Sequence, residues 1–337
     1  MTSRRVHVLT LPRIVYTLVS ALPQMEVTVG FSEPMFSVVL ATFNRADLVM
    51  DAVNSVLAQT LNDFELIIVD DRSTDDTLDV LAKIADSRVT VVVNERSKGY
   101  AGARNTGILR ARARWVCQID SDDLWPTDML ELMAAAIATA PAQVGILYGT
   151  LVYLDTGSGQ VRAVRTAERA GRLHDVLLED HFMSHCGAAL RTDALVAIGG
   201  YDETLRQQAD SDILIRLSKD WAVVAVPDAR YVVREGHADR LMVNPGALLA
   251  FVQLYEKHAA ELVGLPQARY RQLAKILDLA IIYGNIPRVV WAWPRLVPSI
   301  WRTPAIGREF LGQQKKVASL VAGRARHRWQ GLLPTHW

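Results

Sequence analysis

Residues 64–71 read FELIIVDD, an apolar run that ends in two acidic residues. A run without polar alternation is typical of a strand that is buried on both faces of a parallel sheet. Similar runs occupy residues 36–41, 88–93 and 115–119. Segments with helical apolar spacing separate them, at 46–59, 75–84 and 101–113. This alternation predicts an α/β fold with a mostly parallel central sheet, flanking helices and right-handed crossovers.

Polar side chains follow each of the four apolar runs. These polar segments are 42–45, 70–73, 94–96 and 120–123. Ligands of parallel α/β sheets bind outside the carboxyl ends of the strands. We therefore expect the four segments to converge on one ligand site.

The acidic segment Asp120-Ser121-Asp122-Asp123 is the first candidate site. In an extended segment Asp120 and Asp122 point to one side and Asp123 to the other. Neighbouring carboxylates repel each other unless a cation or donors compensate, and oxygen-only ligands suit Mg²⁺ or Mn²⁺ held together with a diphosphate. The alternative is a solvated loop whose aspartates cap a helix that starts near Pro126.

The other segments offer contacts for a nucleotide. Asp71 either accepts a hydrogen bond from a base or a ribose hydroxyl, or belongs to a turn. Backbone N–H groups of residues 42–45 and the helix that follows can receive phosphate oxygens, although no glycine-rich dinucleotide or P-loop motif is present. Arg104 either pairs with a phosphate or forms a surface salt bridge.

Beyond Pro141 the pattern changes to shorter segments. Strands are predicted at 144–148, 151–154, 161–164, 186–191, 222–226 and 229–233, and helices at 192–198 and 210–219. From residue 245 onward the chain is predicted to be helical. Prolines predict breaks near residues 266, 287, 294, 298 and 304.

Composition limits the classes of function. The chain has 337 residues, of which 50% are hydrophobic and 22% charged, so it is not disordered. Its net charge of +1 predicts no nucleic-acid partner. The two cysteines, Cys117 and Cys186, form neither a disulfide framework nor a CxxC pair, which predicts a cytoplasmic location.

Charge is distributed unevenly along the chain. Residues 268–337 contain 12 Lys and Arg but two acidic residues, together with five of the eight tryptophans. Basic, Trp-rich helices suit a peripheral contact with the inner face of a membrane. The alternative is a helical cap that packs onto the catalytic domain or onto a second copy of the chain. No apolar run reaches the roughly 18 to 20 residues of a membrane span.

Five motifs in order carry a resemblance to a known family. They are FSVVLATFNRADLV, QTLNDFELIIVDDRSTDDT, NERSKGYAGARNTGI, WVCQIDSDDLW and SHCGAALRTDALVAIGGYDETLRQQADSDILIRL. Over residues 36–240 the chain resembles glycosyltransferase family 2. The resemblance implies the GT-A fold, a nucleotide-diphosphate sugar donor, a divalent cation (Mn²⁺ or Mg²⁺) and inversion at the anomeric carbon. The acceptor is then a hydroxyl of a carbohydrate or a lipid-linked sugar.

The resemblance also implies roles for single residues on the donor side. The nucleotide-sugar contacts are Thr42, Asn44, Arg45, Asp71, Arg104, Asp120 and Asp122, with Asp71 on the base. Asp122 also contacts the metal. Asp123 matches an acid that some relatives use on the metal, so the division of labour among the aspartates stays open. His237 matches a residue that reaches the diphosphate or the metal in many relatives.

On the acceptor side, Asp210 is the candidate catalytic base. Relatives often have Glu-Asp where this chain has Ala209-Asp210. An inverting transfer needs a carboxylate opposite the leaving diphosphate, which takes the acceptor proton as attack proceeds. The alternative is that Asp210 caps its helix, and Asp212 is then the second candidate base. His185 matches a histidine near the acceptor.

Two functions follow from the sequence. The first is an inverting, metal-dependent transferase that adds one sugar, since residues 325–329 (ARHRW) lack the Gln of the Gln-x-x-Arg-Trp motif of processive synthases. The second is a non-catalytic nucleotide-sugar binder with a degenerate domain. The expected domains are an N-terminal extension (1–34), a catalytic domain (35–243) and a helical, basic C-terminal region (244–337).

Overall fold

The computed structural model describes residues 33–235 and 246–302. From Pro34 onward the described residues fall within one compact unit. The expected extension at 1–32, His237, and residues 303–337 with the ARHRW string lie outside the described residues.

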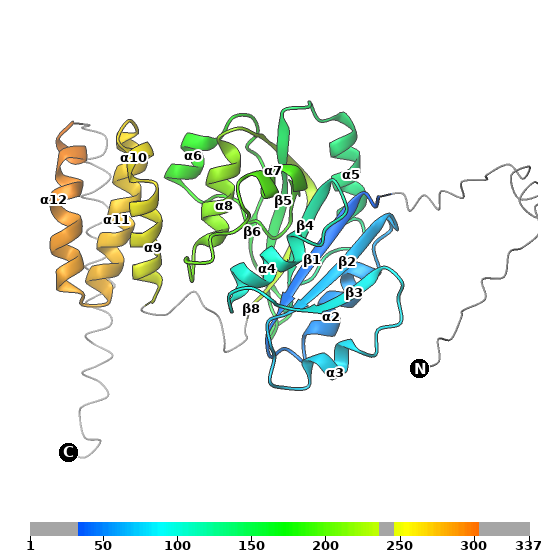
Figure 1. The fold of residues 1–337 in the computed structure, drawn as a ribbon. Coiled ribbons are helices and arrows are strands. Elements are labelled where there is room, and N and C mark those ends of the chain that lie inside the picture. Colours follow the sequence, from blue (N-terminus) through cyan, green and yellow to red (C-terminus); the bar gives the residue numbers. More distant parts are fainter. Residues whose placement is uncertain (1–32, 236–245, 303–337) are drawn as a thin grey trace, which may run out of the picture. The chain divides into compact units, whose positions relative to one another are not determined.

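A mixed sheet organises the fold (Figure 1). Its first half consists of four parallel strands in the order β3-β2-β1-β4. They are β1 (Phe36–Thr42), β2 (Phe64–Asp70), β3 (Val89–Val93) and β4 (Trp115–Asp120). The intervening helices are α2 (Val49–Leu57), α3 (Thr77–Leu81) and α4 (Tyr100–Ile108). The predicted strand–helix alternation is confirmed.

The second half of the sheet mixes strand directions. β7 (Ala188–Arg191) is antiparallel to β4, and β5 (Val144–Asp155) is antiparallel to β7 and to β6 (Val161–Arg165). β8 (Ala222–Glu235) runs parallel to β5. Four helices complete this part: α5 (Met129–Thr139), α6 (His174–Glu179), α7 (Thr192–Ala197) and α8 (Ala209–Ser218).

Two predicted strand breaks in this region are wrong. Residues 144–155 form a single strand, as do residues 222–235. The register shifts between Gly149 and Thr150, where Thr150 Oγ1 donates to the Pro227 carbonyl at 2.7 Å. A Cβ on Gly149 would lie 2.2 Å from the Ala229 carbonyl oxygen. Glycine and proline therefore mark an irregularity within a strand pair rather than two turns.

Alternate residues of β1 enter the cores on opposite faces of the sheet. Phe36, Val38 and Leu40 join one hydrophobic cluster, to which α2 and α5 also contribute. Val39 joins the other cluster, beneath α4 and α8. Burial on both faces explains why the strand sequences lack polar alternation.

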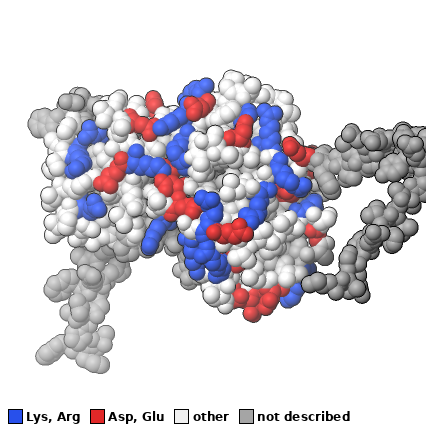
Figure 2. Space-filling model, in the orientation of Figure 1, with Lys and Arg blue, Asp and Glu red and all other residues white. Residues whose placement is uncertain are grey.

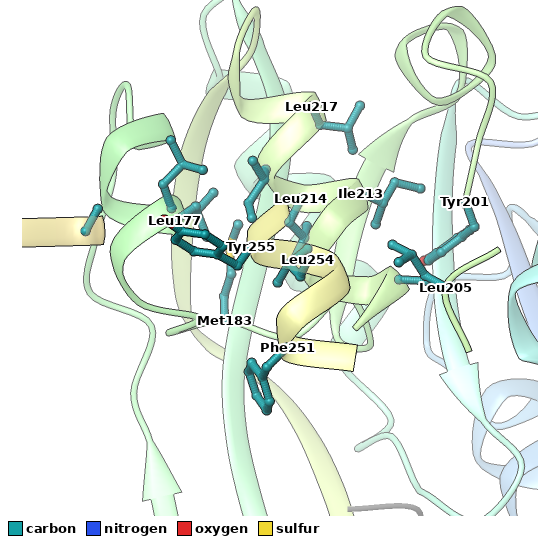
Figure 3. Packing of buried hydrophobic residues seen from close by; sticks show 14 of the residues in the cluster. Leu177, Met183, Tyr201, Leu205, Ile213, Leu214, Leu217, Phe251, Leu254 and Tyr255 are labelled. Carbon is teal, nitrogen blue, oxygen red and sulfur yellow. The ribbon is translucent and has the colours of Figure 1, made fainter. Parts of the chain in front are cut away.

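Four C-terminal helices extend the second core. They are α9 (Gly246–Lys257), α10 (Ala259–Leu262), α11 (Pro266–Ile282) and α12 (Ile286–Arg302). Figure 3 shows Phe251, Leu254 and Tyr255 of α9 beside Leu177 of α6 and Leu214 of α8. This packing agrees with the helical-cap alternative for these four helices. Among the described residues, no helix combines the length and hydropathy that a membrane crossing requires.

Prolines act differently from the prediction in the last helix. Pro266 begins α11 as expected, but α12 continues through Pro294 and Pro298. Both prolines are exposed, so water can bind the backbone carbonyls that lose a helical partner.

Figure 2 shows acidic and basic side chains interspersed across the face that is drawn.

Candidate functional site

The central strands end at a common edge of the sheet. In the parallel registers Thr42 pairs with Asp70, and Ala41 pairs with Asp120. The polar residues after β1, β2 and β4 therefore begin at neighbouring positions (Figure 1). The convergence expected from the sequence is confirmed for these strands.

A turn gathers the three aspartates that follow β4. The Asp123 N–H donates to the Asp120 carbonyl at 3.1 Å, so the segment is not extended. One carboxylate oxygen from each of Asp120, Asp122 and Asp123 lies within 4.8 Å of the other two. The expectation that Asp123 would point away is wrong, because the turn reverses its direction. The capping alternative is also wrong, since α5 begins only at Met129.

β8 holds the deepest of these carboxylates. The Tyr231 hydroxyl donates to Asp123 at 2.6 Å, and the Arg234 N–H donates to the same carboxylate at 2.9 Å. Burial and the charge of Asp120 raise the pKa of Asp123 to about 7. The shift shows that the neighbouring carboxylates repel one another, and a bound cation would relieve this repulsion. Its oxygen-only donors fit a hard divalent cation.

Arg104 lies beneath the cluster on α4. It is 5% exposed and forms an ion pair with Asp120. The guanidinium also lies 4.9 Å from the Tyr100 ring centroid and 5.7 Å from that of Tyr201. Burial favours a higher pKa for Asp120, but the charges of Arg104 and His185 and the hydrogen bonds from Cys186 and Arg104 together lower the pKa below its usual value. Arg104 therefore forms an ion pair from a buried position rather than a surface salt bridge, and its contact with a phosphate stays a prediction.

Asp210 is the second residue of α8 and lies beside His185. Asp210 Oδ2 is 3.7 Å from His185 Nδ1, and His185 Nε2 is 2.9 Å from Cys186 Sγ. Burial, and then the charge of Arg104, lower the pKa of His185, so the imidazole is neutral at neutral pH. Gln208, just before α8, adopts φ 64°, a conformation that a non-glycine residue rarely adopts.

The Asp210 side chain is ionised and accessible. Burial favours a higher pKa, but His185 and Arg104 together lower the pKa well below its usual value. The side chain is 41% exposed, so an acceptor hydroxyl can reach it. Asp210 therefore combines the charge and the access that a general base needs.

Asp212 differs completely from Asp210. Its side chain is fully buried, and it accepts from Arg216 Nε at 2.8 Å, Lys257 Nζ at 2.8 Å and His258 Nε2 at 3.0 Å. A carboxylate with these partners joins α8 to the end of α9 and meets no substrate. The expectation that Asp212 is the second candidate base is wrong.

The carboxylate of Asp71 organises the neighbouring loop. It accepts from Asn94 Nδ2 at 2.6 Å and from the Gly99 N–H at 2.7 Å. Thr42 Oγ1 is buried and has no hydrogen-bond partner among the described residues. The unsatisfied hydroxyl of Thr42 and the remaining lone pairs of Asp71 are compatible with nucleotide contacts at this edge.

Asn44 and Arg45 connect two loops at the same edge. Asn44 has φ 50°, its N–H donates to Ser73 Oγ at 2.9 Å, and its Oδ1 accepts from the Thr74 N–H at 2.8 Å. The Arg45 N–H donates to Thr77 Oγ1 at 2.9 Å. These contacts fix the loop after β1 against the loop after β2.

Sequence reasoning missed three residues that shape the site. Cys186 contacts His185, Tyr231 binds Asp123, and Asn94 binds Asp71. Asn94 belonged to a polar segment that the pattern singled out. Cys186 and Tyr231 carried no local signal, because their partners are distant in the sequence or depend on side-chain direction.

Comparison with known proteins identifies the domain. Residues 37–199 match the family model "Glycosyl transferase family 2". Residues 37–199 form a glycosyl transferase family 2 domain. This glycosyltransferase has the GT-A fold that the resemblance implied.

Relatives of this glycosyltransferase cover parts of it. It is 44% identical over 93 residues to the Escherichia coli "UDP-Glc:alpha-D-GlcNAc-diphosphoundecaprenol beta-1,3-glucosyltransferase WfaP", covering 28% of this chain and 37% of the relative. It is 32% identical over 229 residues to the "Succinoglycan biosynthesis protein ExoO" of Rhizobium meliloti, covering 62% of this chain and 64% of the relative. Both alignments therefore span less than two thirds of the relatives.

A solved structure supports the fold of the glycosyltransferase. The S. aureus TarS fragment 1–349, in complex with UDP-GlcNAc, superposes with a TM-score of 0.58 at 21% identity. The match covers 79% of each chain. At this level of identity the likeness concerns the fold.

Proposed function

We propose that this glycosyltransferase transfers a single sugar from a nucleotide-diphosphate donor to an acceptor hydroxyl with inversion, in polysaccharide or glycolipid synthesis. The observation that carries this proposal is the placement of an ionised, accessible Asp210 in the same contact network as Asp120, through His185 and Arg104. Asp210 would take the acceptor proton as the hydroxyl attacks the anomeric carbon. His185 would orient the carboxylate.

The donor would bind along the carboxyl edge of β1, β2 and β4. Thr42 and Asp71 would contact the nucleoside, and Asp120 would contact the ribose. Asp122 and Asp123 would hold Mn²⁺ or Mg²⁺, which their oxygen donors fit. When bound, the cation supplies charge that stabilises the leaving diphosphate. A role of His237 beside it stays a prediction.

Relatives suggest the class of acceptor. The name of WfaP specifies a GlcNAc-diphosphoundecaprenol acceptor, and ExoO is named for succinoglycan biosynthesis. We propose a sugar linked through diphosphate to a lipid as the acceptor. Such a substrate lies at a membrane surface, which agrees with the basic, Trp-rich C-terminal sequence.

Asp122→Asn tests the donor site. We expect sugar transfer to fall about 10²- to 10³-fold, because charge stabilisation of the leaving group is lost, and we expect the remaining rate to respond weakly to Mn²⁺. The donor is first chosen from a panel of nucleotide sugars as the one that raises the melting temperature with Mn²⁺. Release of the nucleoside diphosphate then measures transfer.

Asp128→Asn is the matched control for this experiment. Asp128 is exposed and its side chain makes no cap hydrogen bond to α5, so this variant should transfer at the wild-type rate. Equal rates for Asp122→Asn and wild type would contradict the proposed donor site. A wild-type chain that binds a donor but transfers to no acceptor would favour the alternative, a non-catalytic nucleotide-sugar binder.

Helix α12 offers a surface for the proposed membrane contact. Ile286 and Val290 are 71% and 67% exposed, and Trp293 on the same face is 46% exposed. The helix contains three arginines and no acidic residue. An exposed apolar stripe on a cationic helix suits the interface of an anionic bilayer.

Ile286→Ser/Val290→Ser tests this contact in the full chain. We expect binding to anionic liposomes, measured by flotation, to fall at least about tenfold, because two aliphatic side chains that would be buried in the bilayer interface are removed. Leu249→Ser/Val263→Ser removes two other exposed aliphatic side chains as the control. Equal flotation of both double variants and wild type would contradict the membrane contact.

A further inference from the structure

Three cationic side chains on β6, on the loop that follows it and on α11 have no role in the donor site. Arg165 ends β6, Arg169 follows in the next loop, and Lys275 lies on α11. The Arg169 guanidinium lies 4.7 Å from the centroid of the Phe182 ring. Burial lowers the pKa of Lys275, the nearby charge of Asp180 opposes this shift, and the charge of Arg165 adds to it.

Among the described residues, none of the three cations has a carboxylate within ion-pair distance, although Asp180 lies near Lys275. Each is exposed, and none forms an ion pair with a carboxylate in residues 33–235 or 246–302. Two arginines nearby differ, since Arg162 pairs with Asp155 and Arg271 pairs with Glu179 at 3.1 Å. Positive charge that repels itself within a folded domain is relieved when an anion binds.

A short chain of contacts links these cations to the catalytic helix. Lys275 Nζ lies 4.1 Å from the centroid of the Phe251 ring, and His181 stacks on the same ring at 6.5 Å. His181 Nδ1 is 3.0 Å from the hydroxyl of Ser211, which directly follows Asp210. The rings of Phe251 and His181 therefore connect Lys275 to the N-terminal turn of α8.

His181 supplies a further polar group toward the same place. Its Nε2 is buried and has no hydrogen-bond partner among the described residues. Lys275 and Asp210 both lie near enough to change the pKa of His181, in opposite directions. The imidazole thus connects Ser211, which follows the candidate base, with the Phe251 ring that Lys275 contacts.

We propose that Arg165, Arg169 and Lys275 bind the diphosphate of a sugar-diphosphate acceptor whose hydroxyl is presented to Asp210. The inference rests on the proposed function and specifies its acceptor. A diphosphate diester carries two negative charges, which three cations complement. The diphosphate of the donor would bind elsewhere, through the cation that Asp122 and Asp123 would hold after β4. The acceptor sugar would then lie between the two diphosphates.

Equilibrium binding of two soluble acceptor analogues tests the proposal. One is GlcNAc joined through a diphosphate to a short alkyl chain, and the other is the neutral alkyl glycoside of GlcNAc. Both are titrated into the full chain in the presence of saturating UDP and Mn²⁺, so that the donor diphosphate site is occupied. We expect the wild type to bind the diphosphate analogue at least about tenfold more tightly.

The variant Arg165→Gln/Arg169→Gln/Lys275→Gln should lose this preference. Each lost charge-assisted hydrogen bond is expected to weaken binding of the diphosphate analogue by about tenfold, with no change for the neutral glycoside. Lys275→Arg keeps the charge and should retain the preference. The matched control Arg271→Gln removes a charge one turn earlier on α11 and should bind like wild type. Melting temperatures verify that each variant is folded.

Equal binding of both analogues by the wild type, or an unchanged preference in the triple variant, would overturn the acceptor site. A chain that shows the expected preference and yet transfers no sugar would leave the site in place and contradict the proposed function. Binding of the diphosphate analogue that UDP abolishes would place it in the donor site and would also overturn the proposal.

Discussion

Asp210→Asn is expected to lower kcat for sugar transfer by about 10²- to 10⁴-fold, the usual contribution of a general base. The amide keeps the size of the carboxylate but cannot accept the proton of the acceptor hydroxyl. Donor affinity should stay within about twofold of wild type, since Asp210 lies on α8 and the donor contacts follow β1, β2 and β4. Single-turnover transfer and equilibrium donor binding measure the two quantities.

A control at the other end of the helix separates chemistry from structure. Asp220 follows α8 and is exposed, so Asp220→Asn should transfer at the wild-type rate. A kcat for Asp210→Asn close to that of wild type would show that another group is the base. An equal loss of kcat and of donor affinity would show that Asp210 supports the donor site instead.

Asp212→Asn is expected to destabilise the protein by about 3–5 kcal/mol, the usual effect of removing one partner of a buried ion pair. Arg216 and Lys257 would lose the carboxylate that their charges now meet in the interior. The midpoint of urea unfolding should fall accordingly, and donor affinity at low temperature should stay near that of wild type while the protein is folded.

A second variant checks the cause of this destabilisation. The Lys257 side chain is 30% exposed, so Lys257→Gln leaves Asp212 with two partners and lets water solvate the gap. Its effect should be smaller, on the order of 1 kcal/mol. If Asp212→Asn unfolded at the same urea concentration as wild type, the junction of α8 with α9 would not depend on this carboxylate.

The parallel half of the sheet was predictable because its signal is local. Residues 64–69 are apolar except at Glu65, and each is buried. The acids that follow such strands had to meet at one edge once the strands were parallel. Family motifs, rather than spacing, supplied the role of Asp210.

The remaining features depended on contacts that spacing does not encode. Asp210 and Asp212 differ by two positions in one helix, yet the first faces His185 and the second is buried under Lys257 and His258. Lys257 and His258 lie more than 40 residues downstream of Asp212. Asp123 was misplaced for a similar reason, because one backbone hydrogen bond turned the chain after β4.

The joint between α8 and α9 sets a limit on how such proteins can be recombined. A chimera that exchanges the C-terminal helices between relatives at residue 244 would keep Asp212 and discard Lys257 and His258, which contact its carboxylate. The buried Asp212 carboxylate, on the helix that bears Asp210, would then lose two of its three partners. The transplantable unit is therefore α8 together with α9, and a graft that respects this pairing retains the buried charges as a matched set.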